Sequence, residues 1–320
     1  MGTHLITGGA GFIGCNLAAA FLRAGRRVLI VDDLSRGRRE DVERLPSQER
    51  LTFVQADCGR IDDLEQAVAG SGAIDAVWHL AANSDIPAGV VDPRIDLERT
   101  FLTTFAVLGF MRRAGIGELN FASSSAIYGD HGETAIHEDI GPLQPISNYG
   151  AMKLASEAQI RAAVEAWLPR ANVFRFPNVV GAPATHGVMY DFCGKLKAHP
   201  DRLDVLGDGS QQKSYLHVED LVDAMLHIAA LQNGGAFEVF NIGPVDDGVT
   251  VRFIAETIRD LVNERAAIVF GTERRGWVGD VPRFRYATDK LRKTGWRPRL
   301  TSEQAVRRAA AEIVAQELGR

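Results

Sequence analysis

The chain has 320 residues, of which 46% are hydrophobic, and a formal net charge of −5. This length allows one large domain or two modest ones, and the charge argues against general nucleic-acid binding. No apolar run approaches a membrane span, and no charged-then-apolar leader precedes the first predicted strand, so we expect a cytoplasmic protein without a signal peptide. Its three cysteines, Cys15, Cys58 and Cys193, are far apart and suggest neither a disulfide framework nor a metal site.

The N-terminal segment has the pattern of a dinucleotide-binding unit. Residues 3–7 form a predicted buried strand, a glycine-rich turn follows, and residues 17–22 continue as an apolar helix. Such a turn lets the backbone approach a pyrophosphate and directs the helix N-terminus toward it. The residues of this turn and of the helix start are Gly8, Gly11, Phe12, Ile13 and Gly14.

The next predicted strand, residues 28–31, ends at Asp32 and Asp33. A carboxylate here can accept hydrogen bonds from both ribose hydroxyls and would repel a 2′-phosphate, so we predict NAD rather than NADP. Arg36 and Arg38 weaken that preference without cancelling it. A glycine turn that serves only packing is the alternative, and the ordered series of strand, glycines, helix, strand and acid argues against it.

Further predicted strands alternate with helical stretches, which indicates a parallel sheet covered on both faces. They span residues 51–56, 76–80, 118–122 and 172–176. Ligands of such sheets bind beyond the carboxyl ends of the strands. The polar residues at these ends are Asp57, Asn83, Ser124 and Asn178. Each could instead be a helix cap or a turn residue, but together they outline one crevice.

After Asn178 the pattern changes to a loop, a predicted helix over residues 188–198, and a strand and turn over 203–209. Residues 215–218 lead into a helix ending near 231, and residues 237–242 read as a strand that returns to the main sheet. We therefore predict an α/β fold: a Rossmann-type doubly wound parallel sheet with a smaller α/β lobe. The first domain is assigned residues 1–177 plus about 211–244, and the second about 178–210 plus 245–320.

Tyr149 and Lys153 are one helical turn apart, so their side chains point the same way. Ser147 can cap that helix and place Tyr149 in its first turn. A phenol has a pKa of about 10, and a nearby ammonium should lower it and make the phenol a usable base. A hydroxyl such as that of Ser124 could hold the same oxygen. This spacing also occurs by chance on surface helices, and the nucleotide-binding pattern is what favours the functional interpretation.

Seven motifs together resemble one family. They are ITGGAGFIG at 6–14, HLAA at 79–82, SSSAIYG at 123–129, YGAMK at 149–153, RFPNVVG at 175–181, LHVED at 216–220 and FNIG at 240–243. On these motifs the chain resembles the extended short-chain dehydrogenases/reductases, and most closely their UDP-glucose 4-epimerase branch. The resemblance runs from residue 3 to about residue 300.

The resemblance implies a nucleotide-sugar 4-epimerase with tightly held NAD⁺. Tyr149 would take the proton of the 4-hydroxyl, hydride would leave C4, and the 4-keto sugar would turn and take hydride back on its other face. Ser124 and Lys153 would complete the catalytic set. The cofactor would contact Gly8, Gly11, Phe12, Ile13, Gly14, Asp32, Asp33, Asp57, Cys58, Leu80, Ala81, Ala82, Ser123, Tyr149, Lys153 and Pro177. The substrate would contact Asn83, Ser124, Ser125, Tyr149, Asn178, Val205, Leu206, Lys213, Tyr215 and Arg275.

Departures from the family pattern leave the sugar open. Ser125 is followed by Ala126 and Ile127, which cannot transfer protons, so elimination of water is not supported. Lys213 replaces an arginine of the family and cannot form its bidentate fork. If Phe284 faces the sugar, an N-acetyl group fits poorly, whereas Arg283 in that place would suit a uronic acid. UDP-hexoses such as UDP-glucose and UDP-galactose, UDP-N-acetylhexosamines and UDP-hexuronates therefore remain candidates.

Two other functions use the same fold. A 4-keto-sugar reductase would exchange NAD(P) at each turnover, and a non-catalytic NAD sensor would not need Ser124, Tyr149 and Lys153. Asp32 favours the epimerase over the reductase. The apolar stretches at 101–111 and 154–168 match helices that form a four-helix dimer interface in relatives, so we expect a homodimer. The resemblance to nucleotide-sugar epimerases also implies a role in carbohydrate metabolism.

Overall fold

The computed structural model describes residues 2–132, 134–231, 234–273 and 285–319. The chain divides into two compact units. The first comprises residues 1–128, 143–175 and 225–240, and the second comprises residues 129–142, 176–224 and 241–320. The structure thus groups 129–142, 176–177, 211–224 and 241–244 with the second unit, whereas the sequence analysis assigned them to the nucleotide-binding domain. The functional division into domains stays a prediction.

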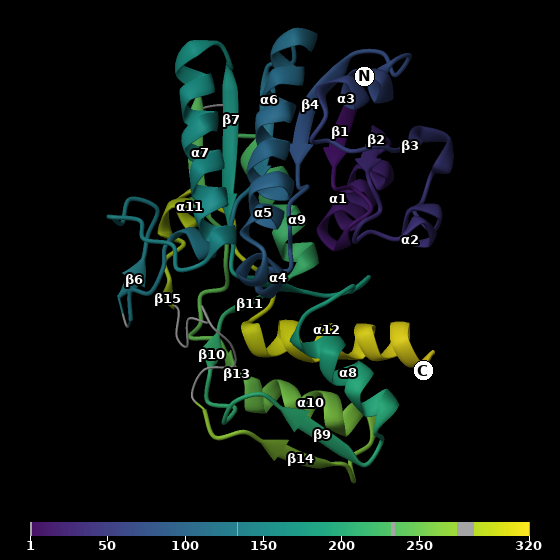
Figure 1. Cartoon of the computed structure of the whole chain (residues 1–320), viewed down its shortest axis with the longest axis vertical. Helices are drawn as coiled ribbons and strands as arrows, with labels where there is room; N and C mark the ends of the chain where they lie inside the picture. The colour runs from purple at the N-terminus through teal and green to yellow at the C-terminus, as the bar shows by residue number, and fades with distance from the viewer. Residues whose placement is uncertain (1, 133, 232–233, 274–284, 320) are drawn as a thin grey trace. The chain divides into compact units, whose positions relative to one another are not determined.

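Within the described residues, a seven-stranded sheet forms the centre of the first unit (Figure 1). Its order is β12-β7-β5-β4-β1-β2-β3, and the pairs from β7 to β3 are parallel. The strands are β1 (Thr3–Thr7), β2 (Arg27–Asp32), β3 (Leu51–Gln55), β4 (Ile74–His79), β5 (Glu118–Ala122), β7 (Arg170–Arg175) and β12 (Phe237–Asn241). The predicted Rossmann-type sheet is confirmed, including the late return strand.

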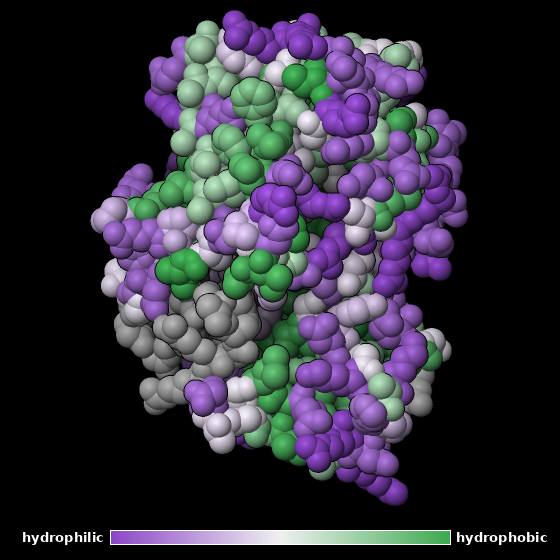
Figure 2. All heavy atoms as spheres, in the orientation of Figure 1, coloured by the Kyte–Doolittle hydropathy of each residue, from purple (hydrophilic) through white to green (hydrophobic). Residues whose placement is uncertain are grey.

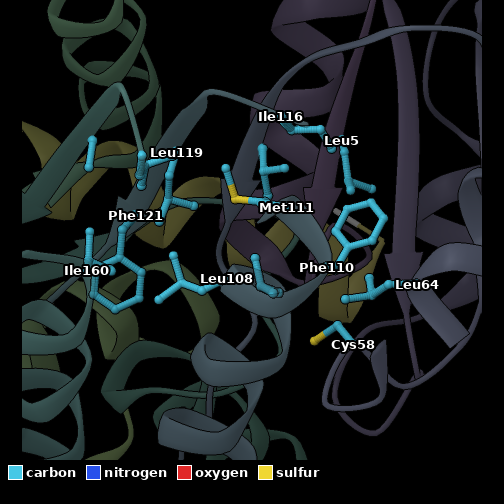
Figure 3. Close-up of a cluster of buried hydrophobic side chains, with 14 of the residues drawn as sticks. Leu5, Cys58, Leu64, Leu108, Phe110, Met111, Ile116, Leu119, Phe121 and Ile160 are labelled. Atoms are coloured by element: carbon cyan, nitrogen blue, oxygen red, sulfur yellow. The ribbon is translucent and has the colours of Figure 1, made fainter. Parts of the chain in front are cut away.

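Helices cover both faces of this sheet, which is why strands such as β2 read as continuous apolar runs. The helices and helical turns of the first unit are α1 (Phe12–Arg23), α2 (Arg39–Glu43), α3 (Ile61–Val68), α4 (Ile86–Val91), α5 (Pro93–Asp96), the π-helical turn η2 (Leu97–Phe101), α6 (Leu102–Ala114), the 3₁₀ turn η3 (Ser125–Ile127) and α7 (Asn148–Ala166), and residues 225–229 of α9 (Val218–Ala229) also belong to it. On one face, side chains of α3, α6 and α7 pack with Leu5, Leu119 and Phe121 (Figure 3). On the other face, Phe21 of α1 stacks on His4.

The second unit contains four two-stranded sheets among its described residues. The pairs are β8 (Asn178–Val180) with β11 (Tyr215–His217), β9 (Arg202–Val205) with β14 (Ala267–Phe270), β10 (Gln212–Lys213) with β13 (Val249–Thr250), and β6 (Ala135–Ile136) with β15 (Arg285–Tyr286). Helices α8 (Val188–Ala198), α10 (Val251–Val262) and α12 (Ser302–Leu318) enclose its core, and α11 (Asp289–Lys293) is short. The predicted helix over 188–198 is confirmed.

Across the described residues, we find no helix that combines the length and the apolar character that crossing a membrane requires.

Candidate active site

The glycine turn after β1 has the geometry of an anion-binding site. Gly8 has a φ of +70°, and a Cβ there would lie 2.6 Å from the backbone nitrogen of Ala81, so only glycine suits the position. Gly11 is the N-cap of α1 and provides no side-chain hydrogen bond to the helix, whose first turn carries no acidic residue. The amide groups of that turn are therefore free of a capping side chain and suit a pyrophosphate.

Asp32, at the end of β2, fixes this turn. Its Oδ2 accepts a hydrogen bond from the Ala10 amide at 3.0 Å, and its Oδ1 accepts one from the Leu34 amide at 2.8 Å. Burial raises the pKa of Asp32 even though both bonds oppose the shift. A carboxylate oxygen has a further lone pair, so Asp32 can still accept from a ribose hydroxyl. Together with the uncapped helix, this arrangement fits a dinucleotide.

The residues after β3 and β4 have different surroundings. Asp57 Oδ1 accepts a hydrogen bond from the Gly59 amide at 2.8 Å. This is a contact within a turn, which is the alternative role that the sequence analysis left open for Asp57. Cys58 is buried, and burial raises the pKa of its thiol. Leu80, Ala81 and Ala82 follow β4, and the Leu80 amide bonds to the Thr7 carbonyl beside the glycine turn.

Tyr149 lies in the first turn of α7, as predicted. Ser147 is the N-cap, and its hydroxyl accepts from the Gly150 amide at 3.1 Å. The Ser124 hydroxyl lies close enough to the Tyr149 phenol to act on it and to oppose the rise in its pKa. Because Ser124 Oγ already accepts from the Ala126 amide at 3.1 Å, its own proton is left to donate to the phenol oxygen. The strand end after β5 and the start of α7 thus meet at one phenol oxygen.

Lys153 is buried one turn further along α7. Its Nζ donates to the Ala122 carbonyl at 2.6 Å and lies 4.6 Å from the ring centroid of Phe121. The distance from Nζ to the ring centroid of Tyr149 is 5.9 Å. Burial lowers the pKa of Lys153 to about 7, and Glu157 partly opposes this shift.

The predicted decrease in the Tyr149 pKa is wrong for this structure. Burial raises the pKa of Tyr149 to about 12, Ser124 acts in the opposite direction, and the charge of Asp96 adds to the increase. The physical reason is that burial disfavours the charged phenolate. Lys153 donates to the Ala122 carbonyl, and burial also disfavours its charged ammonium form, which limits its effect on Tyr149.

Sequence reasoning missed a buried polar network beside this set. Glu157 accepts from the Ser123 hydroxyl and from two nitrogens of Arg175, the closer at 2.6 Å. Arg175 Nη1 also donates to the Tyr128 hydroxyl at 2.9 Å. The available signal was Arg175 itself, a charge between two phenylalanines in a strand that must be buried, which requires an acidic partner.

Asn83 is held by its own neighbours. Its amide nitrogen donates to Asp96 Oδ1 at 2.8 Å, and its backbone amide donates to Thr100 Oγ1 at 3.1 Å. His79, the last residue of β4, is hydrogen-bonded to the hydroxyls of Thr7 and Thr104, so both of its ring nitrogens have structural partners.

Ser125 is the first residue of η3 in the first unit, and the other predicted substrate residues that the structure describes lie in the second unit. Asn178 pairs with Tyr215 in the register of β8 and β11, Val205 ends β9, and Lys213 ends β10. Leu206 is 69% exposed. Pro177, predicted for the cofactor, directly precedes β8 in the same unit. Arg275, Arg283 and Phe284 lie outside the described residues.

Comparison with known proteins agrees with this geometry. Residues 4–243 match the NAD dependent epimerase/dehydratase family. A UDP-glucose 4-epimerase of Azospirillum brasilense is 33% identical over 92% of this chain and 87% of its own length. A crystal structure of a UDP-galactose 4-epimerase is 35% identical with a TM-score of 0.86, covering 99% of both chains. A UDP-glucose 4-epimerase of Thermus thermophilus, solved in complex with NAD, is 28% identical with a TM-score of 0.84, covering 97% of this chain and 98% of its own.

The sheet order, the glycine turn and the Ser124, Tyr149 and Lys153 set accord with this match over three quarters of the chain. The chain belongs to the NAD-dependent epimerase/dehydratase family.

Proposed function

We propose that this protein is an NAD-dependent 4-epimerase of nucleotide sugars, acting on a UDP-hexose such as UDP-glucose or UDP-galactose, or on a UDP-hexuronate. The observation that carries the proposal is that the Tyr149 phenol, the Ser124 hydroxyl and the buried Lys153 come together, with Lys153 Nζ 5.9 Å from the ring centroid of Tyr149. The named activities of the full-length relatives support the same reaction.

The side chains divide the work of the reaction. Tyr149 takes the proton of the sugar's 4-hydroxyl, and Ser124 holds the shared oxygen in place. Lys153 provides a positive charge near the Tyr149 ring. Bound NAD⁺ supplies the acceptor for the C4 hydride and its source on return. Because the pKa of Tyr149 is about 12 in the protein alone, with Lys153 already in place, the charge of the cofactor is needed as well to favour the phenolate.

Elimination of water after the oxidation would need an added acid and base near the serine. The residues in that place, Ala126 and Ile127, belong to η3, and Ile127 is fully buried. Neither side chain can transfer a proton. The local chemistry therefore supports oxidation and re-reduction alone.

For the nucleotide sugar, we propose contacts with Asn83, Ser124, Ser125, Asn178, Val205, Leu206, Lys213, Tyr215 and Arg275. A lysine at 213 can meet a phosphate as a point charge without the two-pronged geometry of arginine. For the cofactor, we propose the glycine turn, Asp32 and Asp33, the segments 57–58 and 80–82, and Ser123, Tyr149, Lys153 and Pro177.

We also propose that the protein acts in the cytoplasm as a homodimer. All three cysteines are buried and unpaired, which suits a reducing compartment. Apolar atoms gather over α6 and α7 in Figure 2, and Leu102 and Phe105 of α6 are 40% and 55% exposed. Such a face is what an interface between two copies would cover.

The first experiment is an NMR assay of purified protein without added cofactor. UDP-glucose, UDP-N-acetylglucosamine and UDP-glucuronic acid are each incubated with the protein, and the anomeric signal of the 4-epimer is followed. A new signal would support both resident NAD and 4-epimerisation, and it would identify the sugar. Silence on all three, in a protein that contains NAD, would contradict the proposed substrates, and silence without bound NAD would favour the reductase.

A further inference from the structure

Two ion pairs join the loop after β2 to the segment after β4. Arg36 Nη2 lies 2.5 Å from Asp85 Oδ2, with the two side chains 42% and 36% exposed. Arg99 Nη1, in η2, lies 3.9 Å from Asp33 Oδ2. We call Arg36, Asp85, Asp33 and Arg99 the clasp.

The clasp spans the glycine turn. In the sheet order, β1 lies between β4 and β2, and all three strands are parallel. Their carboxyl ends therefore share one edge, and the turn after β1 lies between the two segments that the ion pairs join. The loop after β2 also packs on this turn, because a Cβ at Gly37 would lie 2.6 Å from the Ala10 backbone carbon.

The Asp85 side of the clasp is fixed in place. Asn83 donates to the Asp85 carbonyl at 2.9 Å and accepts from the Asp85 amide at 3.0 Å. Asp85 Oδ1 caps α4 by accepting from the Ala88 amide at 3.1 Å. Asn83 is tied in turn to Asp96, which is fully buried. The carboxylate that meets Arg36 is therefore preorganised, which reduces the entropy cost of the ion pair.

We propose that the clasp retains NAD during turnover. The inference rests on the proposed epimerase function and deepens it. An epimerase must keep its reduced cofactor until the hydride returns to the same sugar, whereas a reductase must release its oxidised cofactor every cycle. Arg36 and Asp85 join the segments on either side of the turn that suits the pyrophosphate, so breaking their ion pair should speed the departure of the dinucleotide.

The test measures exchange of NAD directly. Wild-type protein with bound NAD is diluted into excess isotopically labelled NAD, and mass spectrometry of the protein-bound cofactor gives the exchange rate. Arg36→Gln and Asp85→Asn should each raise this rate about two- to fivefold, the range expected for losing one partly exposed ion pair. Asparagine is as good an N-cap as aspartate, so Asp85→Asn keeps the cap of α4 and removes only the charge.

A charge swap and a matched control isolate the pair. The double variant Arg36→Asp with Asp85→Arg should bring the rate back toward wild type. Arg113 and Glu65 form another exposed, long-range pair at 3.4 Å, between α6 and α3, so Arg113→Gln should leave the exchange rate unchanged. Added salt should speed exchange in wild type and have less effect in either single variant of the clasp.

Two results would overturn the proposal. Exchange in both single variants at the wild-type rate would show that the ion pair does not hold NAD. Faster exchange in Arg36→Gln alone, without rescue by the swap, would show that Arg36 acts on the cofactor directly. Both outcomes leave the epimerase proposal standing, since exchange is measured without any sugar. If the clasp slows exchange but the protein has no epimerase activity, the proposed reaction is contradicted and the clasp is not.

Discussion

Burial acts in opposite directions on Tyr149 and Lys153. It raises the pKa of the phenol to about 12 and lowers that of the ammonium to about 7, because each group is pushed toward its neutral form. At neutral pH the phenol keeps its proton and the lysine is near its midpoint. The protein alone therefore does not favour the phenolate form of Tyr149, and the proposed proton transfer depends on what else is bound.

Replacing Tyr149 with Phe removes the hydroxyl and leaves the ring. We expect turnover to fall by about 10²–10⁴-fold, the usual contribution of a positioned acid or base. NAD content, read from absorbance after denaturation, should match wild type. Ser124→Thr keeps a hydroxyl and should retain more activity than Ser124→Ala. Full activity in Tyr149→Phe would remove this residue from the mechanism.

Lys153→Met should abolish activity yet stabilise the fold at low pH. The folded pKa of about 7 lies below the ordinary 10.5, so between these values the unfolded chain binds more protons, and this group makes wild-type stability rise with pH. Below pH 7 the full cost of burying the ammonium is present. The variant should gain on the order of 2 kcal/mol at pH 6, and the gain should shrink toward pH 10. Urea unfolding at several pH values checks this, and a gain independent of pH would contradict it.

Sequence reasoning singled out the side chains that we propose react, but not what surrounds them. Tyr149, Lys153 and Ser124 carry recognisable spacing and strand-end positions. Glu157 and Asp96 do not, because their importance comes from burial and from partners far along the chain. The sequence also does not show that Tyr149 is buried, and for that reason it gave the wrong direction for the shift in the pKa of the phenol.

At the scale of elements, α7 depends on its N-terminal cap. Ser147→Ala should cost about 1 kcal/mol of stability, and because Tyr149 lies in the first turn, kcat should fall as well. Ser147→Asp should restore both. Thr250 caps α10 in the second unit through the Phe253 amide at 3.1 Å, so Thr250→Ala is the matched control. It should lose similar stability without the loss of kcat, and equal kcat losses in the two variants would count against a local effect.

The strands of the main sheet were predictable because each is a short apolar run followed by a turn or a polar residue. Residues 86–100 were not predicted as helical, since they contain two prolines, a glycine and no sustained helical period. The pairs β6–β15 and β8–β11 join segments far apart in the sequence. A pattern read within one window carries no information about such partners.

At the scale of the whole molecule, the exposed face of α6 bears on assembly. If two copies pair through α6 and α7, Phe105→Glu should shift the protein from dimer to monomer, because a charge would be buried in the interface. Light scattering during size-exclusion chromatography gives the mass directly. Leu261→Glu, at an exposed position of α10 in the second unit, should leave the mass unchanged. A wild-type monomer, or a dimer that survives Phe105→Glu, would refute this interface.

The edge strand β12 has a consequence for synthesis of the chain. It pairs beside β7 but spans residues 237–241, so the sheet lacks its last strand until three quarters of the polypeptide has been made. Until then the growing chain presents β7 as an open edge, which invites pairing with other nascent chains. A stop codon shortly before residue 237 would make that exposure permanent. Truncated products should therefore be found with chaperones or in inclusion bodies rather than as a smaller nucleotide-binding protein.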